Sequence, residues 1–547
     1  MNNIEGKTEI VGKLVSSDFF FTVPYYQRPF AWDDENFTNL IDDLMSAVGE
    51  QQYFWGTLVL HKKEGKGIYD VVDGQQRLTS LLILTACCRD LIDDSMFKSQ
   101  LQNKIIQEEN KVDGIAAKPR IEVKDRAIFN EMILTVTGTA VQKKSSDLVE
   151  PENRYVNAVR IFRERLLPQT QDFLQKFSQF INQKCVLIYL STTSFDDAFK
   201  LFTIVNDRGK QLRRIDILKA QNISPNVVPA ETVRNRLAQE WESLEKALGE
   251  TILESILHMM RLIYVKEKPQ EDLYSEFEKR IYKKGLLAPG EKFIDQVSLY
   301  GNLYQQIFLD KDYLDTDTQQ HIPFKAMINI MNQEFAASEW KACLLSFAMK
   351  FSTDGFYDFV LVIEKVYLKD WVGGVRKDER FATYSNVLRA IESSAKSADV
   401  LKALIADTKQ IEKVLSSQNF YGSSYARYFL LRLEVLASEH STYKEYNAKS
   451  IEHVFPQAAK PGSDWSKDPD IGEHKDVVNT IGNLILLSKG KNSSASNHEF
   501  AQKKEKYLKT RVSDYPRSIQ ILAEPDWTIA KIKMRSTKIV AEILGNP

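Results

Sequence analysis

The chain has 547 residues, of which 43% are hydrophobic and 27% charged, and its formal net charge is -1. This length exceeds what one hydrophobic core usually supports, so we expect two or three domains. The longest apolar runs, such as residues 81–88, are far shorter than the roughly 20 residues of a membrane helix. Four scattered cysteines exclude a disulfide framework or a zinc cluster, and with no signal peptide in view they predict a cytoplasmic protein.

The first predicted elements are strands and one capped helix. Polar and apolar residues alternate over residues 8–24, which predicts a strand closed by Pro24. Asp33 or Asp34 can cap the next helix, because a short carboxylate accepts hydrogen bonds from the N–H groups of a first helical turn. Further apolar runs predict two strands and a long helix, at residues 53–60, 68–72 and 78–91.

The turn Asp73-Gly-Gln-Gln-Arg77 opens this long helix. The first N–H groups of a helix lack intrahelical partners and lie at the positive end of its dipole, so the turn and Arg77 form a candidate phosphate site. Gln75 and Gln76 can each donate and accept hydrogen bonds, as reading a base edge requires. The simpler interpretation is that Asp73 only caps a core helix, and for such a turn taken alone it is the commoner one.

The middle of the chain is predicted to be mainly helical, over residues 95–180 and again over 230–430. A buried strand is predicted between the two, at residues 185–190. The polar side chains that follow it are predicted to form a surface network rather than a wall of a nucleotide pocket; they are Asn206, Asp207, Arg208, Asp216 and Lys219. The clearest later helices are expected at residues 233–248, 252–265, 338–351 and 397–415.

The strongest candidate for chemistry is Ser450-Ile-Glu-His-Val-Phe-Pro-Gln457, followed by Asn483 and Asn492. We expect a strand that the proline stops, with Glu452 and His453 at its end and pointing in different directions, because side chains alternate along a strand. Phosphodiester hydrolysis needs a base that deprotonates water and a group that stabilises charge on the phosphate. His453 suits the first task. A Mg²⁺ held by Glu452 and Asn492 suits the second, because Mg²⁺ takes few protein oxygens and keeps several waters. Asn483 would complete the site.

Two features surround this candidate site. Residues 458–475 are predicted to be an inserted loop. Residues 503–538 have an excess of lysine and arginine. A basic helix face is usually only solvated surface, but its place after the predicted metal site favours contact with DNA phosphates.

Several blocks together resemble a known family. Pro24-Tyr-Tyr-Gln-Arg-Pro-Phe-Ala-Trp32, Val72-Asp-Gly-Gln-Gln-Arg-Leu-Thr79 and Phe202-Thr-Ile-Val-Asn-Asp-Arg-Gly-Lys-Gln-Leu212 resemble the DUF262 domain, related to the ParB/sulfiredoxin fold. Ile451-Glu-His-Val-Phe-Pro-Gln457, with Ile481-Gly-Asn-Leu-Ile-Leu-Leu487 and Asn492, resembles DUF1524, an HNH-type (ββα-metal) nuclease domain. Their combination resembles the GmrSD-type, modification-dependent type IV restriction enzymes and SspE-like proteins.

The resemblance implies an α+β multidomain chain. A ParB-like α/β sensor domain would cover residues 1–230, a helical connecting region 231–430 and an HNH nuclease domain 431–547. The residues implied to bind and hydrolyse a nucleoside triphosphate, GTP or ATP, are Asp73, Gly74, Gln75, Gln76 and Arg77, with Tyr26, Gln27 and Arg28 in the same pocket.

For the nuclease, the resemblance makes His453 the general base and Asn483 the residue that orients the histidine loop. Glu452 and Asn492 become the ligands of Mg²⁺ or Mn²⁺. Glu452 is one methylene longer than the Asp found before the histidine in many HNH sites. Asn497 or His498 could take the place of Asn492 as the last ligand.

The predicted function is therefore an NTP-regulated, modification-dependent endonuclease that nicks or cuts phage DNA in bacterial defence. One alternative is a nucleotide-switched DNA-binding regulator with an inactive nuclease fold, and another is an abortive-infection toxin nuclease. The sequence leaves open which DNA modification is recognised, which nucleotide is preferred and whether the chain forms a homo-oligomer. No membrane partner is expected.

Overall fold

The chain divides into two compact units, Met1–Gln239 and Glu240–Pro547. A computed structural model describes residues 4–24, 27, 29–65, 67–109, 111–112, 116–123, 126–141, 143, 148, 152–194, 197–198, 201, 214–224, 226–404, 408–438, 440, 442–446, 450–487, 492–493, 496–508 and 515–545. Among these residues, no helix has both the length and the apolar character needed to cross a bilayer.

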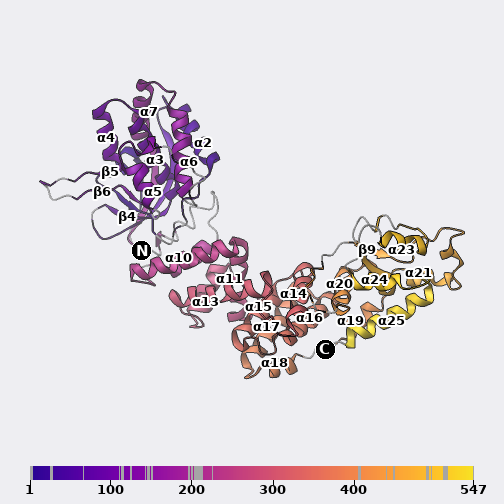
Figure 1. Cartoon of the computed structure of the whole chain (residues 1–547). Helices are drawn as coiled ribbons and strands as arrows, with labels where there is room; N and C mark the ends of the chain where they lie inside the picture. The colour runs from indigo at the N-terminus through magenta and orange to yellow at the C-terminus, as the bar shows by residue number, and fades with distance from the viewer. Residues whose placement is uncertain are drawn as a thin grey trace. The chain divides into compact units, whose positions relative to one another are not determined.

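The first unit is built on a mixed six-stranded sheet with the order β1-β8-β3-β4-β2-β7 (Figure 1). Its strands are β1 (Glu5–Ile10), β2 (Phe20–Thr22), β3 (Tyr53–Lys62), β4 (Ile68–Asp73), β7 (Ile121–Glu122) and β8 (Cys185–Thr192). β3 pairs parallel with β8 and antiparallel with β4, and β2 pairs parallel with β4. A separate pair joins β5 (Ile106–Gln107) and β6 (Lys118–Pro119).

The central helix of this unit is α3 (Gln75–Leu91), which follows β4 directly. Buried residues lie on every side of α3, as expected of a helix enclosed by other elements rather than lying on a surface. The other helical segments of the unit are α1 (Val11–Leu14), α2 (Asp34–Ser46), α4 (Ser95–Ile105), α5 (Arg126–Phe129), η1 (Asn130–Leu134), η2 (Gly138–Ala140), α6 (Glu152–Leu166), α7 (Gln171–Lys184) and α9 (Arg214–Asn222). Asp33 caps α2, as predicted, by accepting from the N–H of Asn36.

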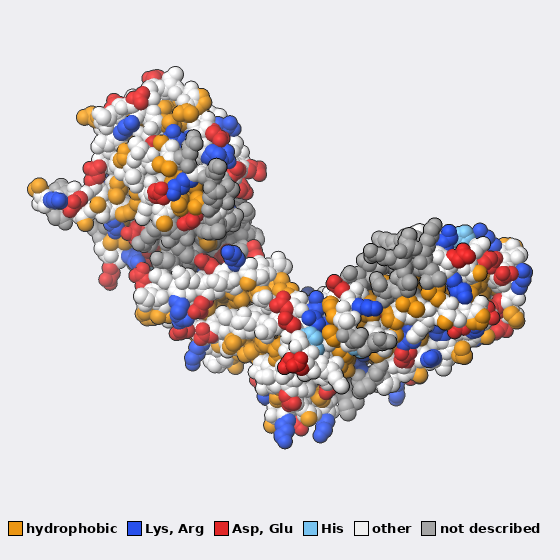
Figure 2. Space-filling view, viewed as in Figure 1, with side chains coloured by type: hydrophobic (Ala, Val, Ile, Leu, Met, Phe, Trp, Pro, Cys, Tyr) orange, Lys and Arg blue, Asp and Glu red, His pale blue; other side chains and the backbone are white. Residues whose placement is uncertain are grey.

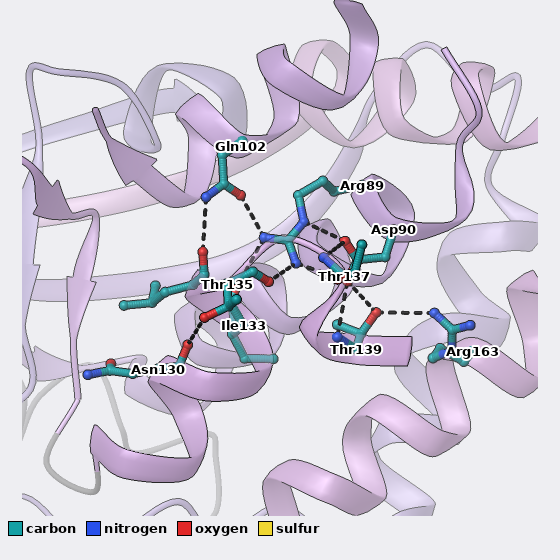
Figure 3. A network of polar contacts seen from close by, with 10 residues as sticks. Arg89, Asp90, Gln102, Asn130, Ile133, Thr135, Thr137, Thr139 and Arg163 are labelled. Carbon is teal, nitrogen blue, oxygen red and sulfur yellow. Dashed lines mark hydrogen bonds and ion pairs between the residues drawn. The ribbon is translucent and has the colours of Figure 1, made fainter. Parts of the chain in front are cut away.

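A buried ion pair fixes the C-terminal end of α3 (Figure 3). The side chains of Arg89 and Asp90 are 0% and 1% exposed, and Arg89 Nε lies 2.7 Å from Asp90 Oδ1. The Arg89 guanidinium also donates to the carbonyls of Ile133 and Thr135. Asp90 in turn accepts from Thr139 N and Oγ1. Burial alone would raise the pKa of Asp90, but the hydrogen bonds from Arg89 and Thr139 hold it below its usual value.

The second unit begins as a succession of helices. These are α10 (Glu231–Leu248), in which the unit boundary falls, α11 (Glu250–Val265), α12 (Leu273–Glu276), η5 (Phe277–Tyr282), α13 (Glu291–Tyr304), η6 (Gln305–Leu309), α14 (His321–Glu334), α15 (Glu339–Phe351), α16 (Phe356–Val372), α17 (Lys377–Ser393), α18 (Ser397–Ala403), α19 (Lys409–Leu415), η7 (Phe420–Gly422) and α20 (Ala426–Leu436). Buried charges are paired here too. Arg261 binds Glu276 with both side chains 1% exposed, and Glu364 accepts from Arg432 Nε at 2.8 Å.

The C-terminal part of this unit is a small hairpin packed among short helices. β9 (Ser450–His453) pairs antiparallel with β10 (Leu484–Leu487). The helical segments are η8 (Asp464–Lys467), η9 (Ile471–Glu473), α21 (His474–Val477), η10 (Ile481–Asn483), α23 (Phe500–Leu508), α24 (Pro516–Leu522) and α25 (Ile529–Gly545). α25 crosses so close to Gly482 that any side chain there would meet the backbone of Ile532.

The helices predicted at 233–248, 252–265 and 338–351 are confirmed as α10, α11 and α15. The continuous strand predicted over residues 8–24 is wrong, because residues 11–14 form α1 between β1 and β2. The helix predicted at 397–415 includes two separate helices, α18 and α19. Residues 458–475 are more than a loop, since they include η8 and η9 and bury Trp465 beside Phe455.

The predicted surface network after β8 is also corrected in part. Asp216 and Lys219 lie on α9 and are buried, with 8% and 2% exposure. Asn206, Asp207 and Arg208 lie outside the described residues. A surface location is therefore wrong for Asp216 and Lys219.

Replacing Arg89 tests the buried network of Figure 3. Arg89→Met should destabilise the first unit by about 3–5 kcal/mol, because it leaves the Asp90 carboxylate buried without a counter-charge. Differential scanning calorimetry of the full chain measures the loss. Arg160→Met is the matched control, because Arg160 is 47% exposed in its ion pairs and should cost less than about 1 kcal/mol. Equal effects of the two substitutions would contradict this account.

Candidate functional site

His453 is the last residue of β9 and lies opposite Leu484 of β10. Its Nε2 lies 3.0 Å from Asn479 Oδ1, and its ring packs edge-on against Tyr421 with a centroid separation of 4.4 Å. Burial lowers the pKa of His453; the hydrogen bond to Asn479 opposes this and the charge of Lys503 adds to it. The ring is therefore mainly neutral near pH 7, as a general base must be.

Asn479 fixes how this imidazole is protonated. An amide oxygen only accepts hydrogen bonds, so Nε2 must carry the proton of the neutral ring, and Nδ1 keeps its lone pair. The same Oδ1 accepts from Gln457 Nε2 at 3.0 Å, and the Asn479 carbonyl accepts from the N–H of Tyr421. Asn479 is not among the residues that the sequence motifs indicated. The one available signal was chemical: a catalytic histidine needs a partner for its second ring nitrogen.

Asn483 is fully buried and holds the chain just after His453. Its Oδ1 accepts from Phe455 N at 2.8 Å and Trp527 Nε1 at 3.1 Å. Its Nδ2 donates to the carbonyls of Phe455 and Val478. With these four bonds Asn483 lies within the scaffold of the loop and does not face a substrate.

Glu452 faces the opposite side of the hairpin from His453. Its cross-strand partner is Ile485, which belongs to the C-terminal core. The Glu452 carboxylate lies 2.8 Å from Lys503 Nζ of α23, and the two side chains are 5% and 1% exposed. Burial lowers the pKa of Lys503, and the charge of Glu452 opposes this effect. The predicted metal ligand thus already has a cationic partner.

The other predicted ligands lie elsewhere around the hairpin. Asn492 donates from Nδ2 to Ser450 Oγ and to the Ile451 carbonyl, at 2.5 and 3.0 Å, at the start of β9 rather than at its His453 end. Asn497 and His498 are exposed. Within the described residues, no three His, Cys, Asp or Glu side chains could together hold a metal ion. That Glu452 and Asn492 share one cation stays a prediction.

Residues 503–538, the basic tail, have less unpaired positive charge than their composition suggests. Several of its cations contact acceptors within the same unit: Lys503, Lys504, Arg517, Lys531, Lys533 and Arg535. In the space-filling view, blue and red side chains are mixed on the visible face of the C-terminal part of the chain (Figure 2). Lys509 and Arg511 lie outside the described residues. A continuous positive surface therefore does not follow from these residues.

In the first unit, the turn before α3 is built on Gly74. Its φ of +91° places it in the left-handed region that favours glycine, and an added Cβ would meet Leu58 and Thr57 of β3. The next residues start α3. This close approach of backbone to β3 explains why the turn after Asp73 needs glycine, whether or not a ligand binds there.

The glutamines near this turn hold a neighbouring segment. Gln76 is buried and its Oε1 accepts from Ala31 N at 2.8 Å. Gln27 donates from Nε2 to the Val72 carbonyl of β4 at 2.7 Å. Arg77 donates to the Thr57 carbonyl, and its guanidinium lies over Gly56. The structure thus brings Gln27 and the 29–32 segment to the turn.

Two of the residues predicted for this pocket, Tyr26 and Arg28, lie outside the described residues. So does the third sequence block, residues 202–212. Gln75, which is buried at the start of α3, also has an interaction within the chain. A nucleotide pocket at this turn stays a prediction.

The fold and the sites define a multidomain α+β protein. The six-stranded sheet and its glycine turn belong to the first unit. The candidate for hydrolytic chemistry, the neutral histidine at the end of the hairpin, belongs to the second. Two family models match the chain: the N-terminal domain of GmrSD restriction endonucleases over residues 10–223, and the C-terminal domain of GmrSD restriction endonucleases over residues 405–542. The chain belongs to the GmrSD-type type IV restriction endonuclease family, which confirms the GmrSD-type resemblance drawn from the motifs. The ParB-like and HNH folds that the resemblance also implied stay predictions. No curated protein matches it significantly.

Removing the acceptor on Asn479 tests its role at the histidine. Asn479→Leu should lower DNA cleavage about 10–100-fold, because a histidine that loses its outer partner loses its fixed ring orientation and tautomer. A plasmid-nicking assay measures the rate, and a thermal melt checks the fold. Gln457→Leu removes the other donor to the same oxygen and should have a much smaller effect. Unchanged cleavage in Asn479→Leu would rule this role out.

Proposed function

We propose that this chain is an endonuclease that hydrolyses phosphodiester bonds in foreign DNA, with His453 as the general base. The family supports a restriction endonuclease in phage defence. The single observation that supports the base is the geometry of His453: a half-buried, neutral imidazole whose Nε2 is held by Asn479. Nδ1 is then the nitrogen able to accept a proton from water.

The proposed reaction uses residues around the hairpin. His453 takes the proton of the attacking water at Nδ1, and the imidazolium that forms is stabilised by Asn479 Oδ1 at Nε2. Asn483 holds the backbone at Phe455, so the histidine loop keeps its shape while charge develops. This preorganisation avoids a rearrangement during the reaction.

A divalent metal ion, which the nuclease family implies, would stabilise charge on the phosphate and on the leaving oxygen when bound. That Glu452 and Asn492 hold this ion stays a prediction. The ion pair between Glu452 and Lys503 weighs against it, and no step proposed above depends on it.

The proposal includes regulation by a nucleoside triphosphate that binds at the Asp73–Arg77 turn of the first unit, together with recognition of modified DNA. Support comes from a helix start that follows a glycine turn, where N–H groups and the helix dipole favour a phosphate. The half-buried Arg77 lies in the first turn of the same helix. Gln27 also lies beside the turn, where it donates to the Val72 carbonyl.

His453→Ala tests the proposed nuclease. Cleavage of plasmid and phage DNA in Mg²⁺ should fall at least about 100-fold, because removing a general base costs this much or more. The matched control is His258→Ala, since His258 lies on α11, is 46% exposed and lies beside Glu254 in an i,i+4 pair. Full cleavage by His453→Ala would remove the assignment, and loss in both variants would point to a folding defect.

Arg77→Ala and Asp73→Ala test the nucleotide site. Each should lower GTP or ATP hydrolysis. For Arg77→Ala the loss should be about 10-fold or more, because a charge-assisted contact to phosphate contributes roughly 1.5–3 kcal/mol. Phosphate release measures turnover, and calorimetric titration measures binding. Arg160→Ala, on an exposed face of α6 in the same unit, is the control. Nucleotide turnover that both variants keep at the wild-type rate would refute this site.

A further inference from the structure

A buried lysine lies directly behind the candidate base. Lys503 extends from α23 to the end of β9, where its Nζ lies 2.8 Å from Glu452 Oε1 and 2.7 Å from the His453 carbonyl oxygen. Its side chain is 1% exposed. A lysine is almost never fully buried unless it is paired. Its one ammonium group here contacts both the carboxylate beside the histidine and the backbone of the histidine itself.

The local sequence explains why Glu452 accepts this partner. Neighbouring residues of a strand point to opposite faces, so Glu452 and His453 cannot face the same space. The Glu452 side of the hairpin is shared with Ile485 and with the core. An ionised carboxylate on that side needs an opposite charge to remain buried, and Lys503 supplies it.

Three contacts consequently hold the chain at His453. Lys503 holds its carbonyl, Asn479 holds its ring, and the N–H of the next residue, Val454, donates to the Asn483 carbonyl at 3.0 Å. Two of these contacts fix the backbone and one fixes the imidazole. Loss of the Lys503 contact would release the strand end from which the imidazole projects.

We propose that Lys503 is a positioning residue of the nuclease site, and that the Glu452 carboxylate has this ammonium, not a metal ion, as its partner. The proposal rests on the proposed function of His453. A metal ion at Glu452 would displace the ammonium from its only carboxylate partner in the described ion pairs. Any metal ion that the nuclease binds is then held by donors other than Glu452.

A double-mutant cycle on the full chain tests this pair. The variants are Glu452→Gln, Lys503→Met and the two combined, because Gln and Met keep the side-chain shapes while removing both charges. Lys504→Met is the matched control, since Lys504 is the next residue of α23 and donates to the Glu524 carbonyl instead. Each variant is measured by thermal unfolding, by steady-state plasmid nicking well below its unfolding temperature, and by Mn²⁺ binding followed by electron paramagnetic resonance.

Each single substitution should lower the unfolding temperature by several degrees and lower kcat for nicking at least about 10-fold, with KM within about twofold of the wild type. The double variant should unfold at a higher temperature than either single variant, because no unpaired charge is left in the core. It should nick no faster than Lys503→Met, because both lack the ammonium contact to the His453 carbonyl. Mn²⁺ affinity should stay within about twofold of the wild type in Glu452→Gln and in the double variant. Lys504→Met should match the wild type in all three measurements.

Two outcomes would overturn the proposal. A loss of Mn²⁺ affinity of about tenfold or more in Glu452→Gln and in the double variant would make Glu452 a metal ligand. Additive losses of unfolding temperature in the double variant would show that the two side chains do not act as a pair. Failure of the proposed function can be told apart from failure of this inference. Undiminished nicking by His453→Ala would refute the proposed function, whereas the unfolding temperatures would still measure the coupling between Glu452 and Lys503.

Discussion

The alternation of side chains along β9 is the constraint on which the C-terminal site depends. It sends Glu452 into the core and His453 to the other face of the hairpin. Because Glu452 is buried, it needs a counter-charge, and Lys503 provides it from a helix 51 residues further along the chain. Because His453 is on the far face, it is free of that ion pair and bonds to Asn479 instead.

Both units use the same physical device to fix irregular backbone. A buried cation pairs with one carboxylate and donates its remaining hydrogen bonds to carbonyl groups of a nearby segment. Arg89 does this with Asp90 for residues 133–135, and Arg261 does it with Glu276 for residues 267–268. Lys503 follows the same rule at His453. The cost of burying a charge is offset only when all of its partners are in place, which makes such segments rigid.

The turn before α3 shows how a structural need and a proposed ligand site can share residues. Gly74 is required because β3 approaches closely, and Gln76 is required because it holds the 29–32 segment. These contacts explain why Gly74 and Gln76 occupy their positions, even with no nucleotide bound. They also position a helix start beside Arg77, which is the arrangement that a phosphate would need.

The sequence by itself determined the family, the capped start of α2, the major helices and the strand that ends in His453, because these depend on local patterns and short motifs. It also pointed to His453 as the candidate base from its chemistry. Only the tertiary structure decided which side chains meet: the partners of Glu452 and His453 are Lys503 and Asn479, which lie 51 and 26 residues away along the chain. Local patterns fix the direction in which a side chain points, but long-range packing decides which partner it meets. For that physical reason the sequence could place Glu452 on its strand but could not identify Lys503 as its partner.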